Sequence, residues 1–503
     1  MSLIKKSGLR QPQAHITRRD FLKLAAAATA LAACGRVAGQ SEIVMTAPVA
    51  AASSTQTVAA PQAQHWLAAN RLMFGPTPGD IDHIAAIGLD AFIEEQLAHD
   101  KQNPAEAEKR IDAITGLRDT LTARPGQLTD DKRQEIYQDI AQATLLRAVY
   151  NPAQLYELMV DFWSNHFNIL FQKNTGEYLK TSDDRDVIRP NALGKFRDLL
   201  GASAHSPAML VYLDNQSNRK GKPNENYARE LMELHTLGVD GGYRQKDVTE
   251  LARILTGWSI QPPNRFSNVE AQSAPGNTES MPGFWFNERV HDQGDKEWLG
   301  HRVHAQGQKE GEFALDALAK HPSTAKHLAF KLAQYFVHDQ PSPALVAKLA
   351  QVFLDHDGAI VPVLSSLFVH EAFWAKENIG AKFKTPYQYV LSAVRALGVT
   401  PANLQVLSGA MATQGMPLYG CPTPDGYRNT EAAWLNPDGM TKRINFATML
   451  ASGRMGINVP TETLISHLGP LVSEPTKILA REAAQDPALA SALVLAGPSM
   501  MRR

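Results

Sequence analysis

Cysteine is almost absent from this 503-residue chain, which contains only Cys34 and Cys421. Cys34 lies in an N-terminal signal described below, so Cys421 is expected to be a free thiol and the fold must hold without an internal disulfide. The paired CxxC motifs of a cysteine-based zinc site are also missing. The stability of the folded part therefore has to come from its hydrophobic core.

Several motifs with a known chemical mechanism are missing as well. The sequence contains no GxSxG nucleophile elbow, no GxGxxG turn, no phosphate-binding P-loop and no HExxH helix. Cys421 lies in the loop segment YGCPTPDG with no histidine near it in sequence. Nucleophilic catalysis by serine or cysteine therefore has little support.

Basic charge is not in excess either, because the formal net charge is −1. Residues 1–33 hold six Lys or Arg and one Asp, so the rest of the chain carries −6. Nucleic-acid binders need a basic surface, and the composition argues against such a partner. A hydrophobic content of 44% is ordinary for a globular protein.

The N-terminus has the features of an export signal. A basic stretch precedes TRRDFLK at 17–23, an alanine-rich apolar run and LAACG at 31–35. This order predicts a secretory signal over residues 1–34, and the paired arginines predict the twin-arginine route. The apolar run is shorter than the roughly 20 residues of a membrane-spanning helix.

Cys34 predicts lipid attachment, because Leu31-Ala32-Ala33-Cys34 resembles a bacterial lipobox. Cleavage near Ala33 without lipidation is the alternative. Residues 35–63 are rich in Ala, Ser, Thr, Gln and Pro and almost uncharged, as expected of a flexible tether. We expect a periplasmic or cell-surface protein. The residue directly after Cys34 is Gly35 and not an acidic residue, which favours sorting to an outer membrane over an inner one.

The remainder, residues 64–500, predicts a mainly α-helical domain with few short strands. Apolar residues recur at three- and four-residue intervals along most of it, and FWFNERV at 284–290 is the best strand signal. A helical subdomain after about Pro386 is one possible division. The polar insert at about 260–283 is long enough for a lid or binding loop.

Three polar clusters interrupt the helical pattern. The first is FWSNHF, in which His166 follows an aromatic helix. In the second, NENYARELMELHTLG, Asn226, Glu230 and Glu233 fall on one helical face beside Arg229. The third is FNERVHDQGDK, which contains His291, Asp292 and Lys296.

Carboxylates three residues apart on a helix, with histidines from other elements, are the ligand types of a divalent metal site in a helical bundle. We therefore interpret Glu230, Glu233, His166 and His291 as candidate metal ligands. Asn226, Arg229, Asp292 and Lys296 are then candidate catalytic or substrate-binding residues. The alternatives are an ion-pair network around Arg229, a core histidine at 166 and a simple turn at 291–292.

The same clusters resemble the bacterial domain of unknown function 1800 (DUF 1800) family. The resemblance runs from about residue 65 to 453 and includes RLMFGPTPGD, FWSNHF, DVTELARILTGW, KTPYQYVLSAVRALG and GMPLYGCPTPDGY. It implies an exported, mainly helical protein with no established activity. It also implies a partner from another exported family, the DUF 1501-like proteins, which resemble sulfatases and phosphatases.

Two functional hypotheses follow. The first is a divalent-metal-dependent enzyme of the cell envelope, which would fold and acquire its ion before export. The second is a non-catalytic envelope protein that binds, matures or anchors a partner exported enzyme, with the polar clusters acting as a buried network.

The export signal can be tested directly. Replacing Arg18 and Arg19 together by Lys should abolish export, because that route reads the arginine pair. Cys34→Ala should release the protein from the membrane fraction, since it removes the acylated thiol. Fractionation and immunoblotting measure both, and membrane retention of the Cys34→Ala protein would contradict lipid attachment.

Overall fold

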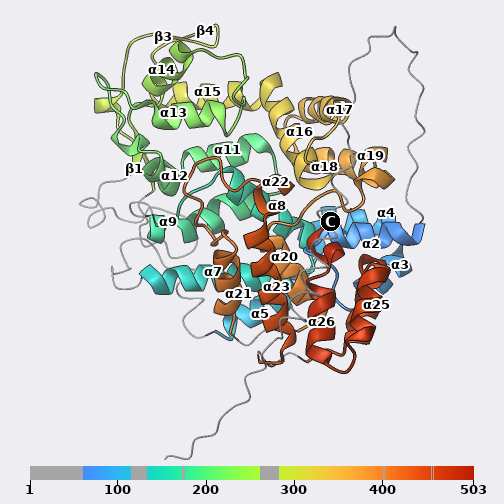
Figure 1. Ribbon diagram of the computed structural model, residues 1–503. Coiled ribbons are helices and arrows are strands. Elements are labelled where there is room, and N and C mark those ends of the chain that lie inside the picture. The colour runs from blue at the N-terminus through green and yellow to red at the C-terminus, as the bar shows by residue number, and fades with distance from the viewer. Residues whose placement is uncertain are drawn as a thin grey trace, which may run out of the picture.

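The computed structural model describes residues 61–114, 133–172, 176–260, 283–399, 403–454, 456 and 458–503 (Figure 1). The predicted signal, Cys34, nearly all of the tether and residues 261–282 of the insert lie outside the described residues. Within the described ranges the prediction of a mainly helical domain is confirmed.

The helices occupy most of the described chain. The first group contains α2 (Pro61–Leu72), α3 (Asp80–Ile87), α4 (Leu89–Leu97), α5 (Ala105–Asp112), α7 (Arg133–Tyr150), α8 (Gln154–His166), α9 (Gly176–Ser182), α10 (Arg189–Asn191), α11 (Phe196–Ala204), α12 (Pro207–Tyr212), α13 (Glu225–Glu233) and α14 (Gln245–Ile254). The second contains α15 (Gln308–Ala319), α16 (Pro322–Phe336), α17 (Pro343–Asp355), α18 (Ile360–Phe368), α19 (Glu371–Trp374), α20 (Pro386–Leu397), α21 (Gln405–Thr413), α22 (Glu431–Trp434), α23 (Pro437–Ala451), α24 (Thr461–Leu468), α25 (Glu474–Glu482) and α26 (Pro487–Leu495).

Two antiparallel hairpins are the sheets of the described part. Strand β1 (Trp258–Ile260) pairs with β2 (Phe284–Phe286), and β3 (Lys296–Trp298) pairs with β4 (His301–Val303). The predicted strand at 284–290 is therefore correct for its first three residues. The rest of that segment turns into a short 3₁₀ helix at Glu288–Val290, where the Asn287 side chain accepts from a backbone amide.

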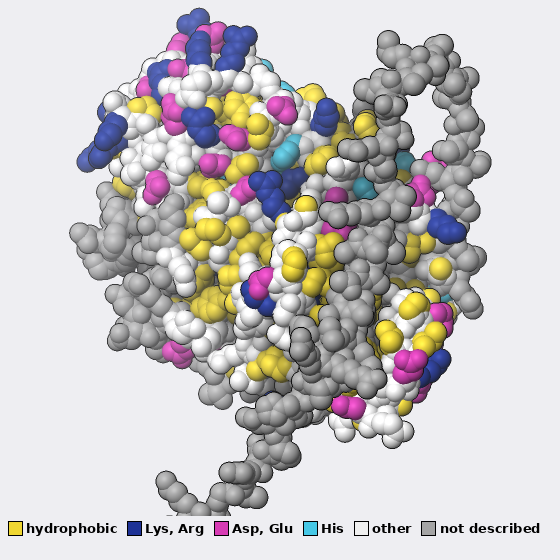
Figure 2. Space-filling view, in the orientation of Figure 1, with side chains coloured by type: hydrophobic (Ala, Val, Ile, Leu, Met, Phe, Trp, Pro, Cys, Tyr) yellow, Lys and Arg dark blue, Asp and Glu magenta, His cyan; other side chains and the backbone are white. Residues whose placement is uncertain are grey.

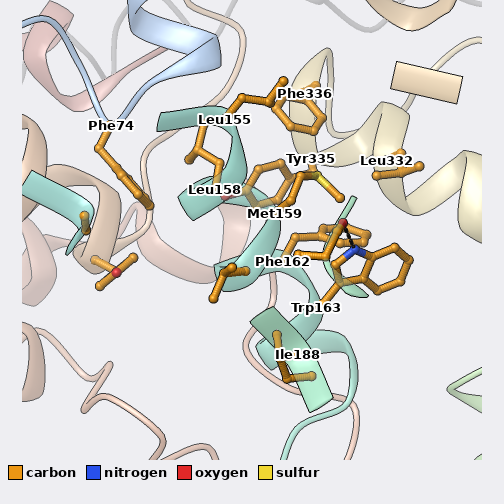
Figure 3. Packing of buried hydrophobic residues seen from close by; sticks show 14 of the residues in the cluster. Phe74, Leu155, Leu158, Met159, Phe162, Trp163, Ile188, Leu332, Tyr335 and Phe336 are labelled. Atoms are coloured by element: carbon orange, nitrogen blue, oxygen red, sulfur yellow. Dashed lines mark hydrogen bonds between the residues drawn. The ribbon is translucent and has the colours of Figure 1, made fainter. Parts of the chain in front are cut away.

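Helix α8 lies at the centre of the core, and nine of its thirteen residues are buried. Leu155, Leu158, Met159, Phe162 and Trp163 are all buried, and Figure 3 shows them packed among side chains of other helices. The indole nitrogen of Trp163 donates to the carbonyl oxygen of Ala192 at 2.9 Å, so its one polar atom is satisfied.

Helix α16 packs against α8 through aromatic side chains. The rings of Phe162 and Tyr335 meet edge to face with centroids 5.4 Å apart, and Leu332 and Phe336 lie nearby (Figure 3). His321 caps the start of α16 and Pro322 fills its first turn, which fixes where the helix begins. The contact of the two rings sets the C-terminal part of α8 against the last turns of α16.

The core is continuous across Pro386, where the sequence suggested a subdomain. All residues of α20 are buried, and its side chains join the same hydrophobic cluster as those of α2 and α8. Backbone hydrogen bonds also tie Lys382 to Arg503 and Lys384 to Met501. In Figure 1 the C-terminal helices accordingly lie against the N-terminal ones.

Two further features bear on the expectations from sequence. Cys421 is buried and unpaired in the described part of the chain, as the cysteine count predicts. In the described ranges, no helix combines the length and apolar character needed to cross a membrane.

Gly311 in α15 tests how tightly this core is packed. A β-carbon at Gly311 would lie 2.1 Å from Cζ2 of buried Trp258. We expect Gly311→Ala to lower the free energy of unfolding by about 1–3 kcal/mol, because overpacking forces the indole to shift. Denaturant titration followed by tryptophan fluorescence measures this.

The matched control is Gly409→Ala in α21, where a β-carbon would meet no atom within 4 Å. That change should leave stability level or raise it by about 0.5–1 kcal/mol through helix propensity. Equal effects of the two substitutions would show that the contact between Gly311 and Trp258 is not tight.

Candidate active site

A cavity of about 600 Å³ lies between the end of α8, helices α13 and α16, and the segment 416–429. The charged and imidazole side chains that line it are Asp161, His166, Glu230, Glu233, His327, Lys331, Asp425 and Arg428. On the face drawn in Figure 2, hydrophobic side chains gather across the middle, with basic and acidic ones near the position of α22. Three of the four predicted metal ligands, His166, Glu230 and Glu233, therefore share one cavity.

Two asparagines at the end of α8 hold the segment 416–429 in place. The Asn165 side chain accepts from the backbone amide of Tyr427 at 2.7 Å and donates to its carbonyl at 2.9 Å. The Asn168 side chain donates to the carbonyls of Cys421 and Thr423. Gly426, with φ of +71°, lets this segment approach, because a β-carbon there would lie 2.2 Å from the carbonyl oxygen of Asn165.

His166 and Lys331 form a direct contact at the base of the cavity. The Lys331 ammonium lies 2.8 Å from Nδ1 of His166, while Nε2 of His166 lies 3.1 Å from the carbonyl oxygen of His235. A carbonyl oxygen only accepts, so Nε2 carries the proton and Nδ1 accepts from Lys331. Both nitrogens of this neutral imidazole are thereby occupied.

The surroundings of Lys331 disfavour positive charge. Burial, then the charge of Lys331, hold the pKa of His166 well below its ordinary value. The same causes lower the pKa of His235 to about 3 and that of His327 to about 4. Burial also lowers the pKa of Lys331 itself to about 8, against an opposing effect of Asp425. A lysine with this pKa is partly neutral near physiological pH.

Glu230 and Glu233 lie on successive turns of α13 and face the same cavity. Both are half-buried, and in the described part of the chain neither forms an ion pair. The Tyr243 hydroxyl, 3.5 Å from Glu233, makes one long contact. Burial and then the neighbouring Glu233 raise the pKa of Glu230. Glu230 is therefore a carboxyl group that holds its proton more tightly than usual.

Asn226 and Arg229 have structural partners and do not line the cavity. Asn226 donates to the carbonyl of Leu213 at 3.2 Å, and Arg229 lies 3.0 Å from Glu225. Arg229 also donates to Gln245 of α14. The ion-pair network considered from sequence thus forms with Glu225 rather than with Glu230 and Glu233.

His291 and Lys296 belong to a separate, sealed cluster. The ring nitrogens of His291 face the Thr256 carbonyl at 2.7 Å and the Glu310 carboxylate at 3.0 Å, and Lys296 bonds the other oxygen of Glu310 at 2.5 Å. Burial alone would raise the pKa of Glu310, but the bonds from His291 and Lys296 outweigh it and keep the pKa low. These side chains are fully buried. Their bonds to Glu310 connect α15 to the segment that contains His291 and to strand β3.

Asp292 is bound in the same region by Arg253 of α14. Its two oxygens lie 2.9 and 3.1 Å from the guanidinium nitrogens. The hydrogen bonds from Arg253 hold the pKa of Asp292 below its ordinary value despite partial burial. Asp292 also accepts a hydrogen bond from the amide of Gly294. This bond fits the turn at 291–292 that the sequence analysis gave as an alternative.

The expected four-ligand metal site is therefore divided between two places. His291 is engaged in the sealed cluster, and His166 contacts Lys331. Among the residues that the structure describes, no three His, Cys, Asp or Glu side chains are grouped so that they could hold an ion. Glu230 and Glu233 remain together in the cavity.

Sequence reasoning missed Lys331, His327 and Asp425. A detectable signal existed for two of them, because His327 and Lys331 lie four residues apart in KHLAFKLAQYF and so share a helical face. A lone Lys on an amphipathic helix, however, is ordinarily a surface residue. Asp425 sits in a Pro- and Gly-rich loop whose position depends on Asn165, which is 262 residues from Tyr427.

Glu230→Gln tests the unpaired carboxyl. A raised pKa means that the folded protein binds the proton more tightly, so wild-type stability falls as pH rises from the unfolded pKa through the folded one. The variant should therefore unfold with equal or higher free energy near pH 7, and the difference should vanish well below pH 4.5. Melts across this pH range, with and without a chelator, measure this.

Glu225→Gln is the control. The bonds from Thr249, Gln245 and Arg229 lower the pKa of Glu225, so removing the charge of this carboxylate should destabilise the protein slightly near pH 7. A loss of about 3–5 kcal/mol for Glu230→Gln, with or without chelator, would show a buried ion pair instead.

Comparison with known proteins gives the family. Residues 67–502 match the family described as "Protein of unknown function (DUF1800)", and residues 15–33 match the twin-arginine translocation pathway signal sequence. No curated protein and no solved structure matched. The signal indicates export across the cytoplasmic membrane. The chain is thus an exported, mainly helical protein that belongs to the DUF1800 family.

Proposed function

We propose that this protein is an enzyme of the cell envelope and that the cavity between α8, α13 and α16 is its active site. The observation that carries the proposal is the contact of 2.8 Å between Lys331 and a neutral His166 inside a cavity that also exposes Glu230 and Glu233. Perturbed titratable groups gathered in one concave site are typical of catalytic centres.

Lys331 and Glu230 are suited to transfer protons to and from a bound molecule. A neutral Lys331 amine is a base or nucleophile, and burial favours that form by lowering its pKa to about 8. His166 holds the amine in position through Nδ1. Burial raises the pKa of Glu230, which is the direction expected of a carboxyl group that serves as an acid. Burial thus lowers the pKa of the lysine and raises that of the glutamate, and both changes are in the directions by which enzymes tune such groups for acid and base catalysis.

A metal-dependent form of this enzyme is the second candidate. Two half-buried carboxylates without an ion-pair partner among the described residues attract a divalent cation, and oxygen ligands suit such ions. Glu230 and Glu233 would hold it. His166 could join them only by releasing Lys331, because both of its nitrogens are occupied.

A non-catalytic role in binding or anchoring an exported partner, such as a DUF 1501-like protein, remains the alternative. It is supported by apolar side chains at the cavity mouth, where Val239 is 70% and Phe330 is 40% exposed. Lipid attachment at Cys34, with outer-membrane sorting, is part of either proposal and would keep the protein in the envelope.

The reactivity of Lys331 tests the enzyme proposal without a known substrate. We expect its acylation by acetic anhydride, followed by peptide mass spectrometry, to rise through a midpoint near pH 8, since only the neutral amine reacts. Exposed Lys195, whose pKa is raised by its bond to Asp357, should respond at higher pH and serves as the control. A Lys331 midpoint at or above that of Lys195 would contradict the proposal.

A further inference from the structure

The cavity contains negative charge that the protein does not neutralise. Glu230 and Glu233 have no salt bridge with the described cations, and adjacent Arg229 is directed to Glu225 and Gln245. Two half-buried carboxylates on successive turns repel each other, which costs free energy unless a cation lies between them. A bound molecule that carries a cationic group at this point would remove the cost.

The cavity also contains positive charge without a carboxylate in ion-pair range. The Lys331 ammonium has His166, a neutral ring, as its hydrogen-bond partner, and no salt bridge to it occurs within the described ranges. Arg428 also lines the cavity, but it pairs with Asp425 at 2.9 Å. Lys331 therefore has donors available for an anionic group of a ligand.

The two charges form no salt bridge with each other in the described part of the chain. The largest effects of charge on the pKa of Glu230 come from Glu233, Arg229 and Asp425. The largest on the pKa of Lys331 come from Asp425 and Arg428. The carboxylate pair and the ammonium therefore stand apart in one cavity, on α13 and α16 respectively.

The volume and the apolar lining of the cavity restrict which ligand can contact both the carboxylate pair and the ammonium. The cavity of about 600 Å³ is within the usual range of small-molecule sites. Val239, Phe330 and Met416 give its lining apolar surface. A ligand that matches this surface has a cationic end, an anionic end and small apolar groups between them.

We infer that the cavity binds a zwitterion of the amino-acid or short-peptide class, with its ammonium group at Glu230 and Glu233 and its carboxylate at Lys331. The inference rests on the proposed function in that it assigns a ligand to the same cavity. In this arrangement the backbone of the bound molecule spans the cavity between α13 and α16.

Alanine peptides provide the probe. Calorimetric titration compares di-, tri- and tetra-alanine having both termini free with the N-acetylated and the C-amidated forms of each length. Amidation keeps the size of the peptide, acetylation adds one small acyl group, and each removes one charge. At the length that fits, the free peptide should bind at least about tenfold more tightly than either capped form. Equal affinity of a capped and a free peptide at every length would overturn the inference.

Variants assign each end. The Glu230→Gln, Glu233→Gln double variant should lose the preference for a free ammonium over the acetylated form, while keeping the preference for a free carboxylate over the amide. Lys331→Met should do the reverse. Glu225→Gln, which changes a carboxylate outside the cavity, should change neither preference. Loss of both preferences in either cavity variant would contradict the assigned orientation.

Three outcomes distinguish a failure of the ligand assignment from a failure of the proposed function. Binding of Mn²⁺ or Zn²⁺ alone to Glu230 and Glu233, with no peptide competing for the site, would overturn the zwitterion and favour the metal-dependent form. A Lys331 acylation midpoint near pH 8 without peptide selectivity would remove the ligand assignment and leave the enzyme proposal. Peptide selectivity with an unreactive Lys331 would support the ligand and remove the catalytic role.

Discussion

The packing of α8 against α16 is the constraint on which the candidate site depends. Phe162 and Tyr335 meet edge to face and hold the two helices together. One turn beyond that contact, the same two helices place His166 against Lys331. Because α8 is buried on almost every side, it cannot rotate without exposing several large apolar side chains, so the polar pair is fixed by hydrophobic packing.

Two buried polar clusters have opposite characters. In the sealed cluster of His291, Lys296 and Glu310, every charge has a partner and the side chains are inaccessible, as expected of a group that fixes a fold. In the cavity, neutral rings surround an amine while carboxylates stand apart from it. Charges in the cavity that no partner neutralises lower the stability of the protein. Their presence in an accessible cavity therefore favours a role in ligand binding over a purely structural role.

Helical periodicity was sufficient to predict the fold class, because amphipathic spacing depends on local sequence. The Glu230 and Glu233 pair was recognisable for the same reason. His291 was grouped with them because residue type says nothing about which distant element a side chain will meet. The partners of His291 come from Thr256 and α15, and these contacts are set by tertiary packing. Lys331 was overlooked because its burial, rather than its sequence context, makes it unusual.

The bonds between Asn165 and Tyr427 also affect how fast the cavity can form. They close a loop of 262 residues, and such long-range contacts form slowly because the chain must first lose the entropy of that loop. Until they form, α8 and α16 could dock while one wall of the cavity is still missing. A chain of this kind benefits from completing its folding before it is exported. A pathway that transports folded proteins meets that kinetic requirement.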